Sequence, residues 1–87
     1  MPIDPETLKS AEEWIRTYLT YCGVKNASAI PLAQHTEKHF MMNFNHEERA
    51  YTLDLDPSDI NGIVAVSKQV RKAVIDRIDI LLQRQRL

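Results

Sequence analysis

The stretch from Asp56 to Leu87 decides the predicted fold, and it reads DPSDINGIVAVSKQVRKAVIDRIDILLQRQRL. Asp56 can accept a hydrogen bond from a first-turn amide as the N-cap of a helix, and Pro57 suits the first helical position, where no amide donor is needed. An apolar stripe at helical spacing follows, made of Ile60, Ile63, Val64, Ser67, Val70, Val74, Ile78 and Leu81. The pattern predicts one long helix. Glycine costs about 1 kcal/mol relative to alanine inside a helix, so a break near Gly62 or Ala65 is compatible with the pattern.

A second apolar row sets this helix apart. Val66, Ala73 and Ile80 recur every seven residues, and Ile75 and Leu82 add to them. At about 1.5 Å per residue, a helix of about 28 residues spans roughly 40 Å, about twice the length of a strand of six or seven residues. We therefore expect part of the helix to extend beyond the sheet. Its apolar side chains there need cover from the first helix, a second copy of the chain or a different partner.

Residues 4–22 predict an N-terminal helix. Asp4 and Pro5 form the same Asp-Pro opening as the C-terminal stretch, and Gly23 suits the left-handed position that ends a helix. One apolar stripe is made of Leu8, Ala11, Ile15, Tyr18, Leu19 and Cys22. The stripe indicates that this helix packs on the rest of the protein through a single face.

Residues 39–55 predict a β-hairpin, because apolar residues alternate with polar ones on both sides of a polar segment at residues 45–48. The apolar set is Phe40, Met42, Phe44, Tyr51, Leu53 and Leu55. The polar segment lacks an Asn-Gly pair, so we expect a loop longer than two residues. Upstream, residues 29–32 form a candidate short strand, which must lie at a sheet edge because Pro31 has no amide donor.

The order of these elements predicts a single α+β domain over residues 1–87. It has an N-terminal helix, a two- or three-stranded antiparallel sheet and a long C-terminal helix, which gives the order αββα or αβββα. Since only one face of the hairpin is apolar, we expect the helices to be packed on one sheet face.

The net charge of −1 hides an asymmetry along the chain. Residues 1–66 carry ten acidic and five basic residues, a charge of −5, whereas residues 67–87 carry six basic and two acidic residues, a charge of +4. A basic segment can mark a contact surface for nucleic acid or an acidic protein, but it is more often a solvated helix face with cations near the negative end of its dipole.

Several observations point to a cytoplasmic protein. Cys22 is the only cysteine, so no internal disulfide can form. The N-terminal residues lack the basic and apolar regions of a signal peptide, and no apolar run approaches the roughly 18 residues of a membrane span. We expect no contact with a membrane.

The candidate chemical sites are weak. His35, His39, His46 and Cys22 are the residue types that bind metals, but we predict coil and strand around the histidines, so converging ligands are not expected. Cys22 lies near the end of a helix, where the dipole disfavours a thiolate. With two glycines there is no glycine-rich phosphate loop. We expect no catalytic residue, cofactor site or metal site, and no enzyme activity.

The helix–strands–helix order resembles the double-stranded-RNA-binding fold in outline. The final helix of that family opens with a lysine cluster that binds phosphates. Here the final helix opens with Asp56 and Asp59, which repel phosphates, so the RNA-binding function is not carried over. The size and layout also suit small adaptors, regulators or inhibitors encoded by phages and bacteria.

Two functions remain. The preferred one is a non-enzymatic protein-binding module, alone or as a homodimer, that acts through the long C-terminal helix and the open sheet face. We expect its partner-binding residues to include Val66, Ala73, Ile80, Lys68, Arg71, Lys72, Arg77 and Met41, the last because it points to the open face. The alternative is a nucleic-acid-binding protein that uses the basic residues Lys68, Arg71, Lys72, Arg77, Arg84 and Arg86.

Overall fold

A computed structural model of the protein describes residues 3–83. The elements are the helix α1 (Pro5–Tyr21), a 3-10 turn η1 (Ala27–Ala29), the strands β1 (Ala33–Thr36), β2 (His39–His46) and β3 (Arg49–Leu55), and the helices α2 (Pro57–Val64) and α3 (Lys68–Gln83). The predicted α+β class is confirmed, with an N-terminal helix, three antiparallel strands and a long helix at the C-terminal end.

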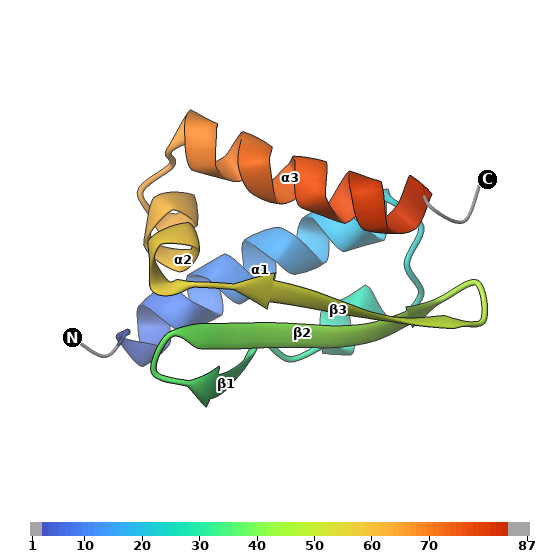
Figure 1. The fold of residues 1–87 in the computed structure, drawn as a ribbon, viewed down its shortest axis with the longest axis horizontal. Coiled ribbons are helices and arrows are strands. Elements are labelled where there is room, and N and C mark those ends of the chain that lie inside the picture. The colour runs from blue at the N-terminus through green and yellow to red at the C-terminus, as the bar shows by residue number, and fades with distance from the viewer. Residues whose placement is uncertain (1–2, 84–87) are drawn as a thin grey trace.

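The three strands form one antiparallel sheet in the order β1-β2-β3, with β2 in the centre. In Figure 1 the strands lie at the lower front, α1 passes behind them, and α3 runs along the top beside β3. Residues of β2 and β3 alternate between exposed and buried positions, so one face of the sheet packs on the helices and the other faces solvent. The predicted packing of the helices on one sheet face is confirmed.

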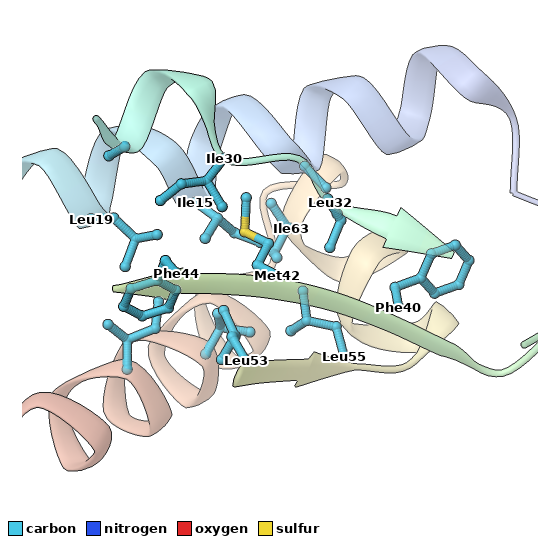
Figure 2. Packing of buried hydrophobic residues seen from close by; sticks show 14 of the residues in the cluster. Ile15, Leu19, Ile30, Leu32, Phe40, Met42, Phe44, Leu53, Leu55 and Ile63 are labelled. Atoms are coloured by element: carbon cyan, nitrogen blue, oxygen red, sulfur yellow. The ribbon is translucent and has the colours of Figure 1, made fainter. Parts of the chain in front are cut away.

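The hydrophobic core lies between this sheet face and the helices. Side chains from α1, β2 and β3 point toward one another in Figure 2, including Ile15, Leu19, Met42, Phe44 and Leu53. Five apolar residues of the predicted hairpin set are buried, and Tyr51 is half-buried, with its ring stacked on Phe44 at 5.6 Å between centroids. Burial of apolar area at about 25 cal/mol per Å² is the main stabilising contribution.

The strand expected at residues 29–32 is wrong by several positions, because β1 begins at Ala33. Two backbone groups of residues 29–32 form hydrogen bonds with side chains of α1 instead of with a strand. The Arg16 Nε donates to the Ile30 carbonyl at 2.7 Å, and the Leu32 amide donates to the Glu12 carboxylate at 2.8 Å. Because these groups bond to a helix, they are not free to pair with β2.

The predicted long hairpin loop is also wrong. His46 of β2 pairs directly with Arg49 of β3, so Glu47 and Glu48 alone form the turn. Both have positive φ, 51° and 68°, which is the backbone of a type I′ turn. The preference for Asn-Gly is statistical, and here two glutamates accept the left-handed conformation at a cost of about 1–2 kcal/mol each.

The continuous helix predicted from Asp56 is broken into α2 and α3 between Ala65 and Ser67. The Ser67 amide donates to the Gly62 carbonyl at 2.9 Å, and the Val66 amide donates to the Ile63 carbonyl at 3.2 Å. These two bonds are those of a Schellman motif, in which the residue after the C-cap is left-handed. The break follows Ala65, close to where the sequence allowed one, but the residue in the left-handed conformation is Val66 and not a glycine.

Three other helix ends are formed by the residues predicted for them, namely Asp4, Gly23 and Asp56. The Asp4 carboxylate accepts from the Glu6 amide at 3.1 Å, and Gly23 ends α1 with a φ of 89°. Asp56 accepts from the Asp59 amide at 2.8 Å, while the Asp59 carboxylate accepts from the Asp56 amide at 3.1 Å, which is a capping box. The Asp59 amide, followed by the Ser58 hydroxyl, holds the pKa of Asp56 below its usual value.

The close approach of α2 to α3 yields a first prediction. A Cβ added at Gly62 meets the Val70 side chain at 2.6 Å, and a β-branched side chain cannot rotate away freely. We expect Gly62→Ala to destabilise the protein by about 1–3 kcal/mol in urea denaturation. The double variant Gly62→Ala/Val70→Ala should lie close to Val70→Ala alone. A single variant more stable than the wild type, as helix propensity alone predicts, contradicts this packing.

The strained turn yields a second prediction. Val66 is β-branched, exposed and left-handed with a φ of 58°. Relief of about 1–2 kcal/mol of strain should exceed the 0.4–1 kcal/mol of backbone entropy that a glycine adds to the unfolded chain. We expect Val66→Gly to raise the free energy of unfolding by about 0.5–1 kcal/mol. Val64→Gly, two residues earlier inside α2, is the control and should lower it.

Candidate functional site

A groove of about 470 Å³ lies between the outer edge of β3 and the flank of α3. Its lining comes from both elements and from the start of α2, and comprises His39, Thr52, Leu53, Asp54, Leu55, Asp56, Asp59, Arg77, Ile80 and Leu81. The groove is therefore built by segments that the fold, and not the local sequence, brings side by side.

The wall formed by β3 is a free strand edge. In the described part of the chain no strand lies beyond β3. His46 and Arg49 flank a two-residue turn, so they form a hydrogen-bonded pair, and hydrogen-bonded pairs then alternate along the hairpin. By this alternation Ala50, Thr52 and Asp54 direct their backbone N–H and C=O groups away from β2. The Arg77 guanidinium donates to the Asp54 carbonyl at 3.1 Å, which agrees with that direction.

The wall formed by α3 consists of the apolar residues Ile80 and Leu81 next to the guanidinium of Arg77. Ile80 is 53% exposed and Leu81 is half-buried, and both line the groove. The large hydrophobic residues exposed in the described part of the chain are Tyr21, Val64, Val66 and Ile80. Of these four, Ile80 alone stands beside a free strand edge. It provides apolar area next to unpaired backbone groups.

The groove carries a net negative charge. Asp54, Asp56 and Asp59 face it with one guanidinium, that of Arg77, which leaves a charge of −2 with His39 neutral. Arg77 is 2.7 Å from the Asp59 carboxylate and compensates it. Asp54 and Asp56 are exposed, and the partner of Asp54 is His39 Nδ1 at 3.5 Å. The groove thus offers its negative charge at the end of β3.

A second hollow, of about 680 Å³, lies between η1 and the end of β2 that leads into the hairpin turn. It is lined by Gly23, Lys25, Asn26, Ala29, Ile30, Pro31 and residues 43–48. None of the four exposed large hydrophobic residues lines it. It therefore lacks the apolar anchor that the groove beside β3 has.

The structure separates the predicted row of Val66, Ala73 and Ile80. Val66 lies in the turn between α2 and α3, so it shares no helix face with the other two. Ala73 is exposed on α3 outside the groove, and Ile80 lines the groove. The heptad spacing failed because a left-handed residue resets the helical phase. Partner binding by each of these residues stays a prediction.

The basic residues predicted to form a contact surface are largely engaged within the protein. Arg71 donates to the Ile63 carbonyl at 2.7 and 3.0 Å and stacks 5.1 Å above the Trp14 ring. Arg77 bonds to Asp59 and to the Asp54 carbonyl, as described above. Lys72 pairs with Asp76 at 3.0 Å on the surface, and Lys68 is exposed. Arg84 and Arg86 lie outside the described residues.

The open sheet face is mostly polar. Met41 is half-buried there, directly beside Ala33 of β1 and Asp54 of β3. The Thr52 hydroxyl donates to the Asn43 side chain at 2.7 Å across the strands. Met41 is thus a large apolar residue on a mostly polar surface, and it does not line the groove.

A cluster of titratable groups lies at the far end of α1 and α3, around a hollow of about 520 Å³ lined by Tyr18, Cys22, His46 and Asp79, among others. The Tyr18 hydroxyl donates to the Asp79 carboxylate at 2.6 Å, and this bond, with burial, raises the pKa of Tyr18 well above its usual value. Burial raises the pKa of the Cys22 thiol as well. These shifts favour the neutral forms, so the cluster holds no activated nucleophile.

Across residues 3–83, no three or more His, Cys, Asp or Glu side chains converge as they would around a metal ion. His39 lies at the groove and His46 at the Tyr18 cluster, on opposite ends of β2. No helix in this part of the chain is long and apolar enough to cross a membrane.

Comparison with known proteins adds no function, because no family model, curated protein or solved structure matches the chain. The groove residues missed by the sequence reading are Thr52, Asp54, Leu55, Asp56, Asp59, His39, Leu53 and Leu81. Most were interpreted as strand or cap residues, which they are. The contact between Arg77 and Asp59 spans 18 positions and has no local sequence signal.

The Tyr18–Asp79 bond yields a pH prediction. Because the pKa of Tyr18 is higher in the folded protein than in the unfolded chain, its contribution is complete below about pH 10 and is lost as pH rises above that. We expect Tyr18→Phe to lower the free energy of unfolding at pH 7 by about 1 kcal/mol and to reduce the loss of stability between pH 9 and 11. Tyr21→Phe, at an 85% exposed position, should leave both unchanged. Equal profiles for the two variants would contradict the assignment.

Proposed function

We propose that this chain is a non-enzymatic protein-binding module whose groove between β3 and α3 takes an extended segment of a partner protein. The observation that carries the proposal is the free edge of β3 beside the half-exposed side chain of Ile80. Strand addition of this kind draws affinity from main-chain hydrogen bonds and specificity from pockets for alternate side chains.

Main-chain recognition follows from the edge. Ala50 and Thr52 each offer one backbone donor and one acceptor at the free edge of β3, and the Asp54 amide adds a donor; of these three residues, Thr52 and Asp54 line the groove. Unpaired groups of this kind are satisfied by water until a strand replaces it, and native proteins leave such an edge open only with some protection. Ile80 and Leu81 supply the apolar surface that makes pairing with a strand favourable over water.

The long C-terminal helix keeps the role expected of it, through the segment around Ile80. The groove supports a protein ligand better than a nucleic acid, since its charge of −2 repels phosphates. Of the two arginines in α3, Arg77 lines the groove and bonds to Asp54 and Asp59, and Arg71, outside the groove, bonds to Ile63. A phosphate would have to compete with those contacts.

The thiol of Cys22 and the carboxylate of Asp79 have the environment of packed groups, which supports a role in the fold. A single unpaired cysteine suits a reducing compartment, and we propose the cytoplasm. Within such a compartment a small binding module acts as an adaptor, regulator or inhibitor of its partner.

The proposal is tested by selecting ligands from a random peptide library displayed on phage, with the wild-type chain as bait. Ile80→Glu places a charge on the apolar wall and, because the residue is half exposed, should leave the melting temperature nearly unchanged. We expect selected peptides to lose about tenfold in affinity for this variant, which corresponds to about 1.4 kcal/mol.

Ala73→Glu is the matched control, since it introduces the same charged residue seven positions earlier on the same helix but outside the groove. It should bind selected peptides as the wild type does. A selection that returns no ligand, or ligands equally sensitive to both changes, would reject the groove as the binding site.

A further inference from the structure

The side chains of a strand added to β3 divide between two environments. In a pleated sheet, residues directly opposite each other point to the same face. Partner residues opposite Thr52 and Asp54 therefore lie on the open sheet face, where those side chains are exposed. Partner residues opposite Leu53 and Leu55 point to the helix side, where those two leucines are buried. The segment must alternate in character.

The helix-side positions call for apolar side chains. They lie between the buried leucines of β3 and the flank of α3, where Ile80 and Leu81 line the groove. An apolar side chain placed there covers Ile80, which is 53% exposed in the free protein. A polar side chain would lose water without gaining a partner and would cost free energy.

The open-face positions call for basic side chains. Asp54 points to the open face and is exposed, and Asp56 follows at the same end of the groove. Neither carboxylate has an arginine or lysine partner in the described part of the chain; Asp54 faces His39 at 3.5 Å, and Asp56 accepts from Ser58 and Asp59. A lysine or arginine opposite Thr52 or Asp54 is within reach of this charge.

A second copy of this chain fits the groove poorly. If two β3 strands pair antiparallel about Thr52, Asp54 of one copy lies opposite Ala50 of the other, so no basic residue meets Asp54 on the open face. Each groove has a charge of −2, so pairing also brings like charges together.

We infer that the groove takes an extended basic segment of another protein, with apolar side chains at alternate positions beneath α3 and lysine or arginine between them on the open sheet face. The inference rests on the proposed function and specifies its ligand. The pattern is carried by the free edge of β3, the half-exposed Ile80 and the two carboxylates Asp54 and Asp56.

The test uses three synthetic peptides and the full chain. The basic peptide is acetyl-Ser-Val-Lys-Val-Lys-Val-Ser-amide, and the neutral and acidic peptides carry threonine or glutamate in place of lysine. Affinity is measured by fluorescence anisotropy at 50 mM and 500 mM salt. Hydrogen exchange of the Ala50 and Thr52 amides, followed by NMR, reports strand pairing directly, because these amides point away from β2 at the free edge of β3.

We expect the basic peptide to bind about fivefold tighter than the neutral one at low salt, to lose most of that advantage at high salt, and to bind tighter than the acidic one by a larger factor. It should slow exchange at Ala50 and Thr52, with little change at Tyr51 and Leu53, which already pair with β2. Asp54→Asn should bring the ratio of the affinities for the basic and the neutral peptide toward one.

Three results would overturn the inference. Equal binding of basic and neutral peptides, with slowed exchange at Thr52, rejects the basic ligand and leaves the proposed function standing. Binding without slowed exchange at Ala50 and Thr52 rejects strand pairing, and the Ile80→Glu experiment then decides on the groove itself. Slowed exchange at Thr52 that grows with protein concentration in the absence of peptide identifies a second copy as the occupant.

Discussion

Val66 turns the chain out of α2 in a left-handed conformation, and the position of α3 depends on that turn. A helix that continued from Asp56 would keep its two halves on one axis and run well past the sheet. The Schellman bonds at Gly62 and Ile63 end α2 early instead, so that α2 packs on α1 while α3 lies along β3. The groove exists because α3 reaches the edge of the sheet at this angle. The strain at Val66 is therefore a cost of the layout that creates the candidate site.

The sequence predicted the elements whose signals are local. The Asp-Pro openings at Asp4 and Asp56, and the alternation in the hairpin, depend on contacts within a few residues, and the helices and strands formed there. The errors have non-local causes. Side chains of α1 form hydrogen bonds with the Ile30 carbonyl and the Leu32 amide. The register of β2 with β3 leaves only Glu47 and Glu48 to form the turn. The groove is lined by segments far apart in the sequence, so no local sequence motif predicts it.

Charge counted along the chain does not reveal the bonds that the described arginines form within the protein, and partner binding by Arg71 and Arg77 stays a prediction. Arg16, Arg71 and Arg77 each donate to a backbone carbonyl near the end of another segment, those of Ile30, Ile63 and Asp54. A guanidinium suits this task, because it has five donors in a rigid plane and its stem packs on apolar surface. The basic third of the chain resembles a binding surface in sequence, whereas in the fold its two described arginines, Arg71 and Arg77, join elements to one another. The charge left unmatched at the groove is acidic.

The free edge of β3 can pair with unwanted strands, and it can also bind a ligand strand. Edge strands pair with one another unless a charge, a proline or a short length prevents it. Here Asp54 supplies the charge on the open face, and the guanidinium of Arg77 occupies one of the backbone acceptors at the edge. The carboxylate repels acidic strands, including a second β3, and the Arg77 bond removes one acceptor from any strand that pairs there. The same carboxylate attracts a strand that carries a lysine or arginine. Apolar residues on the other face of that strand can pack on Ile80, which is half exposed in the free protein. Protection against indiscriminate pairing and selection of a ligand are, at this edge, one physical arrangement.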